Sequence, residues 1–242
     1  MSPFFPAFLR RWRGETELSS ARVARYYDDW HERYMAAFGD TFPSQLTGEL
    51  GELFTHIADQ AELVPGMRVL DAGCGIAGPA LWLARHRGVN VSAVNISAVQ
   101  VAEARERIDA AGLGDRVVVS LGDYHRLEEL YAPTSFDAVL FLESLVHSDH
   151  PQVALASVHR VLKPGGQFLF LEHGLSPDAQ VARWQHRLNP IQNRIGGGCH
   201  LIRDTAQLVE RSGLHLRDAR HYYLRRVPRF AGYMTEGSAL KS

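Results

Sequence analysis

The 242-residue chain has little cysteine, almost no net charge and no long apolar run, and each absence argues against a class of protein. Its two cysteines, Cys74 and Cys199, argue against a disulfide framework and favour a reducing compartment such as the cytoplasm. The formal net charge of −1 gives no global basic field for nucleic acid or an anionic membrane. No run of about 18 apolar residues occurs, so we expect no membrane span.

The N-terminal end looks superficially like a secretion signal but does not fit one. Its apolar part is short, is interrupted by Pro3 and Pro6, and has its charges after rather than before it. We expect either a loose arm or an arm that packs over a neighbouring or membrane surface. The 45% hydrophobic content suits one α/β domain with a helical appendage.

The most informative stretch is 67–79, which reads MRVLDAGCGIAGP. Its apolar start predicts a buried parallel strand, its glycines a tight turn, and the residues after it a helix. This order predicts the ligand-binding corner of a doubly wound sheet. The spacing of Gly73, Gly75 and Gly78 also fits a dinucleotide fold, but Asp71 would repel a pyrophosphate and attract a cation. The stretch therefore argues against a nicotinamide enzyme.

The same residues, Val69 to Gly78, match a hydrophobic-hydrophobic-Asp-x-Gly-x-Gly-x-x-Gly pattern. In this they resemble the first motif of the class I S-adenosylmethionine-dependent methyltransferases. The resemblance implies a doubly wound, seven-stranded and mostly parallel α/β sheet with an N-terminal helical lid. It also implies that Asp71, Gly73, Cys74 and Gly75 bind S-adenosyl-L-methionine.

Further cofactor residues follow from the same resemblance. Residues 94–100, VNISAVQ, are similar to a subgroup with sterol, tocopherol and prenyl-diphosphate C-methyltransferases, which implies contacts from Asn95, Ile96 and Gln100. Asn95 stands where an acidic residue usually binds the ribose, and an amide can both donate and accept there. After the next strands, the family implies roles for Gly122, Asp123, Tyr124 and Leu142. A plain turn at 122–123 and an exposed Gln100 are the alternatives.

Candidate catalytic residues follow the strands expected at 136–142 and 167–171. Ligand chemistry lies outside the carboxyl ends of such strands, where the sequence places Glu143, His147, Glu172 and His173. We rank Glu143 first as base or cation stabiliser. If residues 143–147 are helical, Glu143 and His147 share a face. A metal site at His147, Asp149 and His150 lacks diagnostic spacing, so we expect none.

The acceptor side is predicted from two segments. A helix at 19–38 carries an aromatic stripe with Tyr26, Tyr27 and Trp30, which is either a lid over the substrate or core packing. The insertion 175–203 resembles a ubiquinone-methyltransferase-like group that includes thiol methyltransferases, implying a substrate cap with Trp184 and His200. Cys199-His200 could be a nucleophile and base, but transfer from a sulfonium needs no enzyme nucleophile.

The predicted organisation is an arm and lid at 1–62 and a core at 63–242 with its cap at 175–203. A helix at 204–212 and a terminal hairpin at 214–224 and 227–236 complete it. The resemblance implies methyl transfer from S-adenosyl-L-methionine, with S-adenosyl-L-homocysteine as product, to a small-molecule acceptor. Carbon methylation of an isoprenoid-like acceptor, O-, N- or S-methylation, and non-catalytic cofactor binding all stay open. We expect no nucleic-acid partner, and a homodimer stays open.

Overall fold

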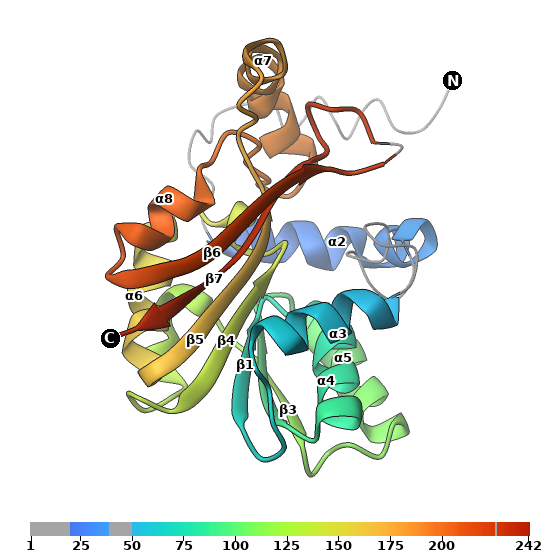
Figure 1. Ribbon diagram of the computed structural model, residues 1–242. Coiled ribbons are helices and arrows are strands. Elements are labelled where there is room, and N and C mark those ends of the chain that lie inside the picture. The colour runs from blue at the N-terminus through green and yellow to red at the C-terminus, as the bar shows by residue number, and fades with distance from the viewer. Residues whose placement is uncertain (1–19, 39–49, 226) are drawn as a thin grey trace.

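The structure, a computed structural model, describes residues 20–38, 50–225 and 227–242, and its centre is one seven-stranded sheet (Figure 1). The strands are β1 (Arg68–Ala72), β2 (Asn90–Asn95), β3 (Val117–Leu121), β4 (Phe136–Leu142), β5 (Leu162–His173), β6 (Leu214–Tyr223) and β7 (Tyr233–Lys241). Their order across the sheet is β3-β2-β1-β4-β5-β7-β6. Only β7 runs antiparallel, to both β5 and β6, so the predicted mostly parallel sheet is confirmed.

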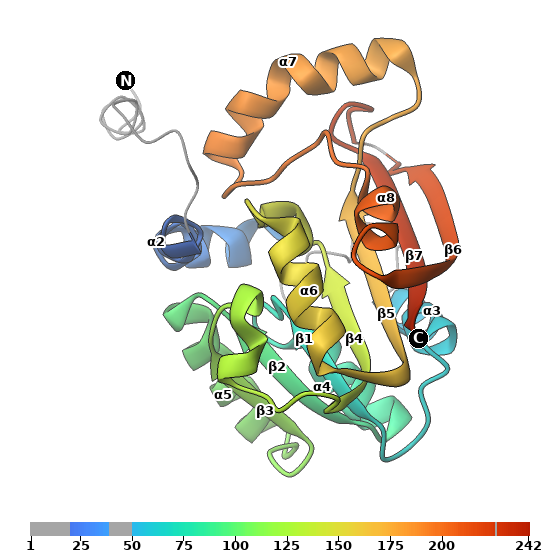
Figure 2. The same ribbon diagram turned by 90° about the vertical axis from the view of Figure 1, so that its left-hand side faces the viewer.

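Helices cover both faces of the sheet (Figure 2). They are α2 (Ser20–Phe38), α3 (Leu50–Gln60), α4 (Gly78–Arg87), α5 (Ala98–Ala110), α6 (Pro151–Val161), α7 (Ala179–Ile195) and α8 (Thr205–Glu210), with short 3-10 helices η2 (Tyr124–Glu129) and η3 (Leu145–His147). One core cluster joins α3, α4 and α5 to the sheet, and a second joins α6 and α8. This is the doubly wound arrangement, and its strand order reverses between β1 and β4.

The central strands form because they are apolar on both faces. In β1, every residue after Arg68 is buried, and in β4 only Asp137 and Leu142 are not. Such runs suit parallel strands that are covered on both sides. The helices begin where the sequence supplies caps, as at Ser97 before α5 and Asp204 before α8. In an open α/β sheet of this kind, ligands bind outside the carboxyl ends of the strands. Helices α2 and α7 lie at that end of the sheet (Figure 1).

Two predicted strands differ from the structure. The last strand, expected at 227–236, is β7 at Tyr233–Lys241, because the Ala231 and Gly232 N–H groups donate to Pro228 O in a turn. The fifth strand starts at Leu162 rather than at residue 167, since its exposed entry continues the pairing with β4.

The segment predicted as a substrate cap contains a long helix. Within 175–203, the 17-residue α7 begins at its cap Asp178 and runs through Pro190. Pro190 removes one backbone donor from the interior of this helix. Expectations about residues 1–19 and 44–49 lie outside the residues that the structure describes.

Candidate active site

The turn after β1 has two glycines with different surroundings. The Gly73 and Cys74 N–H groups donate to Val94 O at 2.8 and 3.2 Å, which ties the turn to β2. Gly73 has φ +83°, and a Cβ there would lie 2.4 Å from the Ser144 Cβ. Gly75 has φ +55°, but a Cβ there would meet nothing within 4 Å. Gly73 is thus fixed by packing, whereas Gly75 borders open space that a ligand can use.

Asp71, at the end of β1, carries an unpartnered buried oxygen. The residue is 2% exposed, and its Oδ2 has no hydrogen-bond partner among the described residues. Burial raises the pKa of Asp71 to about 7. A buried oxygen without a donor costs free energy. A cationic N–H donor of a ligand beside the Gly75 turn would supply the missing partner.

The end of β2 forms a closed amide network. The Asn95 Nδ2 donates to Gly75 O at 2.9 Å and to the Gln100 Oε1 at 2.8 Å. Its Oδ1 accepts from the Ser97 N–H. The Ser97 hydroxyl donates at 2.6 Å to Asp28 of α2. Asn95 and Gln100 therefore lie together as predicted, but the Asn95 N–H groups are already engaged, so its Oδ1 is the atom left for a ligand hydroxyl.

The end of β3 places Asp123 and Tyr124 side by side. Although burial raises the pKa of Asp123, hydrogen bonds from His125 and Ser20 lower it to about 2, so this carboxylate is ionised. The Tyr124 hydroxyl donates to Ser144 O at 3.1 Å. The ring is thereby fixed between the end of β3 and the segment after β4.

Glu143 occupies a strained position directly after β4. Its φ is +53°, uncommon for a residue with a side chain, and its N–H donates to Leu171 O of β5 at 2.7 Å. Burial raises the pKa of Glu143 to about 7. The Glu143 Oε2 lies 3.9 Å from the His173 Nε2, and burial lowers the pKa of His173 to about 4. Two of the four predicted catalytic candidates, Glu143 and His173, thus lie close together, with the histidine neutral.

Segment 144–148 is a tight turn rather than an α-helix, so Glu143 and His147 do not share a helix face. Glu172 and Arg203 hold this turn from two sides. Both Glu172 oxygens accept backbone N–H groups, those of Ser144, Leu145 and Val146. The Arg203 guanidinium donates to backbone carbonyls, those of Leu145, Val146 and Ser148. Burial raises the pKa of Glu172. Its oxygens are occupied, so Glu172 and Arg203 position the turn.

His147 connects this turn to α2 and to the segment after α7. Its Nδ1 lies 3.0 Å from Gly197 O, so this nitrogen carries the proton, and the Tyr27 hydroxyl donates to Nε2 at 2.8 Å. Burial lowers the pKa of His147 to about 4. The neighbouring Tyr26 donates to Ile195 O at 2.7 Å. Both tyrosines of α2 therefore hydrogen-bond to the segments around this turn, an arrangement that fits the lid alternative for the aromatic stripe.

Other predicted residues lie at the same end of the sheet. Burial and Arg203 lower the pKa of His200 to about 4, and its Nε2 lies 3.0 Å from the Asn193 Nδ2. Trp184 is 54% exposed on α7, with the Arg187 guanidinium 5.7 Å from its ring. Of the remaining predicted residues, Ile96 follows β2 and Gly122 follows β3. Leu142 ends β4, and Trp30 lies on α2.

With this geometry in view, comparison with known proteins decides the family. A family model described as a methyltransferase domain matches residues 70–170, the span from β1 through most of β5. Residues 70–170 belong to this methyltransferase family. Methyltransferase GfsG of Streptomyces halstedii is 37% identical over 158 residues, which are 61% of this chain and 56% of that protein.

Other relatives of this chain differ in their named activities. A sterol 24-C-methyltransferase of Yarrowia lipolytica is 34% identical over 72% of the chain and 47% of its own length. The S-adenosyl-L-methionine-dependent Diels-Alderase iccD of Talaromyces variabilis is 31% identical over 75% and 66%. The chain thus spans about half to two thirds of the length of the curated relatives it matches.

Solved structures show the same methyltransferase fold. The [4+2]-cyclase SpnF superposes with a TM-score of 0.77 at 21% identity, covering 94% of this chain and 97% of that one. The Haemonchus contortus phosphoethanolamine N-methyltransferase 2, solved with S-adenosylhomocysteine, has a TM-score of 0.74 at 18% identity, covering 94% and 61%.

Sequence reasoning missed how this site is held. Arg203 ends the predicted insertion 175–203, but nothing in the sequence indicated that it binds the turn after β4. Asp28 was likewise unassigned, although it accepts from both Ser97 and Val99 at the start of α5. Within the described residues, no group of three or more His, Cys, Asp or Glu could hold a metal ion.

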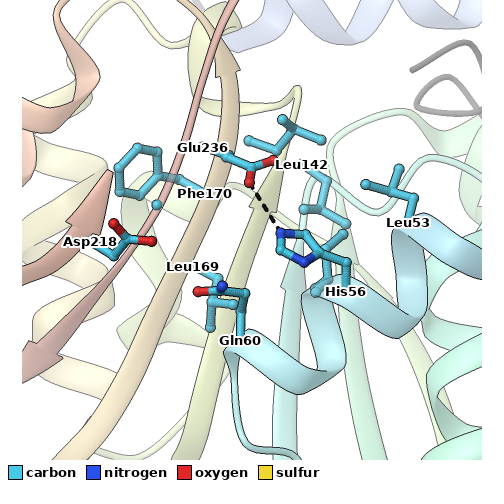
Figure 3. Close-up of a pocket in the computed structure, with 11 residues that line it drawn as sticks. Leu53, His56, Gln60, Leu142, Leu169, Phe170, Asp218 and Glu236 are labelled. Atoms are coloured by element: carbon cyan, nitrogen blue, oxygen red, sulfur yellow. Dashed lines mark hydrogen bonds and ion pairs between the residues drawn. The ribbon is translucent and has the colours of Figure 1, made fainter. Parts of the chain in front are cut away.

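A separate small pocket lies between α3 and the antiparallel edge of the sheet (Figure 3). Glu236 of β7 accepts from Arg220 and Tyr222, and its Oε1 lies 3.1 Å from the His56 Nε2. The cavity volume is about 30 Å³, room for about one water molecule. This cluster therefore fastens α3 to β7 and is too small to hold an acceptor.

Proposed function

We propose that this chain transfers a methyl group from S-adenosyl-L-methionine to a small-molecule acceptor, with a carbon atom of an isoprenoid-like molecule as the first acceptor class. The unpartnered Asp71 oxygen beside the open Gly75 turn carries the proposal, because it suits the amino group of the cofactor. Further along the same edge, Asn95 and Gln100 would receive the ribose, and Asp123 and Tyr124 the adenine.

The chemistry asked of the protein is mainly orientation. The bound cofactor supplies an electrophilic methyl group on a sulfonium. Glu143, strained and buried, would accept a proton from the acceptor or stabilise positive charge on it, with His173 beside it. The aromatic faces of Tyr26, Tyr27 and Trp30 would add to that stabilisation. We include in this proposal a lid within 1–62 and a cap at 175–203.

A heteroatom acceptor is the second candidate, and His147 favours it. Its neutral Nε2 already accepts a hydrogen bond from the Tyr27 hydroxyl. A hydroxyl group of the acceptor could take the place of the tyrosine and be deprotonated there. A third outcome follows from the relative named as an S-adenosyl-L-methionine-dependent Diels-Alderase, since cycloaddition within a bound polyene forms a ring without transfer of a methyl group.

The test is transfer of a labelled methyl group to a panel of prenyl diphosphates, phenols, amines, thiols and polyenes, with products identified by mass. We expect a methylated product, and we expect Glu143→Gln to lose at least about tenfold in turnover while binding S-adenosylhomocysteine normally. Glu106→Gln, an exposed change on α5, is the matched control. Turnover unchanged in Glu143→Gln would remove that role, and a product of unchanged mass would indicate rearrangement. Cofactor binding with no product from any acceptor would refute methyl transfer and favour the non-catalytic alternative.

We also propose a cytoplasmic location, which the two buried free cysteines fit. No helix in the described ranges is long and apolar enough to cross a membrane.

A further inference from the structure

Positive charge is concentrated in two segments of the chain. Residues 179–203 and 219–235 together hold eight arginines and no carboxylate, although Arg220 and Arg229 pair with Glu236 and Asp178 just outside these limits and Arg203 bonds the turn of the site. The remaining residues carry 18 basic and 27 acidic side chains, so the near-neutral total hides a separation of charge. The first segment contains α7, and the second contains the turn between β6 and β7.

Helix α7 also exposes an apolar stripe along one side. Trp184, Leu188, Ile191 and Ile195 follow at helical spacing, and three of them are exposed by 54%, 52% and 50%, with Leu188 half-buried. We call these four residues the α7 stripe. A different side of the helix faces the protein. There the buried Gln185 side chain accepts a hydrogen bond from the Ser176 N–H and donates one to Gly174 O.

The exposed arginines border this stripe rather than interrupt it. By helical spacing, Arg183 and Arg187 lie on the side of the stripe away from Gln185, and both are exposed. The long arginine stems can lie along apolar surface while the guanidinium reaches outward. Going around its axis, the helix therefore has a side hydrogen-bonded to the protein, next to it the apolar stripe, and next to the stripe the basic border.

The two basic segments meet at one end of the molecule. Figures 1 and 2 show α7 and the β6–β7 turn at the same end, and the Arg229 Nη2 lies 3.4 Å from the Asp178 Oδ2 at the start of α7. The other end of α7 reaches the site, since Tyr26 donates to Ile195 O and His147 to Gly197 O. A partner bound to the α7 stripe would thus lie next to the proposed acceptor site.

We propose that the α7 stripe with its border of Arg183 and Arg187, together with the exposed Arg225 of the β6–β7 turn at the same end of the molecule, docks on an anionic lipid surface. A helix with tryptophan and aliphatic residues on one side and arginines beside them lies in the interface plane of a bilayer. Mobile anionic headgroups can pair with arginines spread over two elements, without the fixed acidic partners that a protein surface requires. The docked end would admit an apolar acceptor directly from the membrane.

The experiment is co-sedimentation with vesicles of phosphatidylcholine alone and of phosphatidylcholine mixed with phosphatidylglycerol. We expect binding to the anionic vesicles only, weakening with added salt. Arg183→Gln and Arg187→Gln should each weaken binding roughly fivefold, and the pair Trp184→Ser with Ile191→Ser at least about tenfold. Arg105→Gln on α5 and Val118→Ser on β3, both exposed, are matched controls and should bind like the unchanged protein.

The proposal does not depend on methyl transfer, because the vesicles carry no acceptor. S-adenosylhomocysteine binding and the melting temperature of each variant show whether it is folded. Failure of the unchanged protein to bind anionic vesicles at low salt would overturn the proposal. So would equal losses in the two control variants, or binding to an acidic carrier protein instead of to either vesicle.

Discussion

At the scale of single residues, two buried carboxyl groups define the site. Asp71 is the second-last residue of β1, Glu143 directly follows the neighbouring strand β4, and burial raises the pKa of each to about 7. The family resemblance implied Asp71, and the position after an apolar strand predicted Glu143. The unpartnered Asp71 oxygen and the positive φ of Glu143 were not predicted, because each depends on what the rest of the fold places around it.

Asp71→Asn should stabilise the protein without ligand and weaken cofactor binding. The folded pKa of Asp71 lies above its usual 3.8, so Asp71 ionisation costs stability increasingly as pH rises from about 4 to about 7. At about 1.4 kcal/mol per pKa unit, the full effect is on the order of 4 kcal/mol. The gain in melting temperature should therefore be larger at pH 8 than at pH 5. S-adenosylhomocysteine affinity by calorimetry should fall about 10–100-fold, and a gain independent of pH would contradict this account.

Alanine at Gly75 and at Gly73 should fail in different ways. Gly75→Ala meets no atom of the protein, so it should cost only about 1–2 kcal/mol of stability but reduce S-adenosylhomocysteine affinity at least about tenfold. Gly73→Ala would place its Cβ 2.4 Å from the Ser144 Cβ and should destabilise far more. Thermal unfolding measures the loss of stability in each variant, and calorimetry measures the loss of S-adenosylhomocysteine affinity. Normal ligand affinity in Gly75→Ala would mean that no ligand lies over that turn.

At the scale of elements, short-range patterns predicted strands and caps better than turns. The apolar runs of β1 and β4 identified buried strands, and Asp204 identified the start of α8. The turn at 144–148 was not predictable, since its shape depends on Glu172 and Arg203, which lie about 30 and 60 residues further along the chain. Likewise α7 continues through Pro190, which a local rule reads as a helix end.

Removing Arg203 should lower turnover more than cofactor binding. Arg203→Ala removes the guanidinium that bonds three backbone carbonyls of the turn connecting Glu143 to His147, and Ser148 O loses its side-chain donor. We expect kcat to fall about 10–100-fold. S-adenosylhomocysteine affinity should change less than about threefold, because Asp71 and Gly75 are untouched. Arg203→Lys should recover part of the loss.

The matched control for this change is Arg217→Gln, which breaks an exposed ion pair with Glu62 and should leave both quantities unchanged. Equal losses of turnover and of cofactor affinity in Arg203→Ala would show a general structural role rather than positioning of the turn.

At the scale of the whole molecule, the parallel core is predictable because each βα unit carries its own signal. The placement of α2 is not, because no local pattern says where a terminal helix packs. It lies across the carboxyl ends of the strands (Figure 1), tied to three distant elements by Tyr26, Tyr27 and Asp28. The aromatic stripe alone fitted both a lid and a core helix.

Binding of S-adenosylhomocysteine should therefore protect α2 as well as the glycine turn. A ligand over the Gly75 turn and the Asn95 side chain would lie beneath a helix whose Asp28 is bonded to Ser97, so opening of α2 would accompany release of the ligand. At 100 times its dissociation constant the ligand adds about 2.7 kcal/mol of stability, roughly 5–10 °C in melting temperature. Hydrogen exchange should slow in 20–38 together with 73–78. In Asp28→Asn, protection of 20–38 should fall while that of 73–78 persists, whereas protection of 73–78 alone in the unchanged protein would mean that α2 is not a lid.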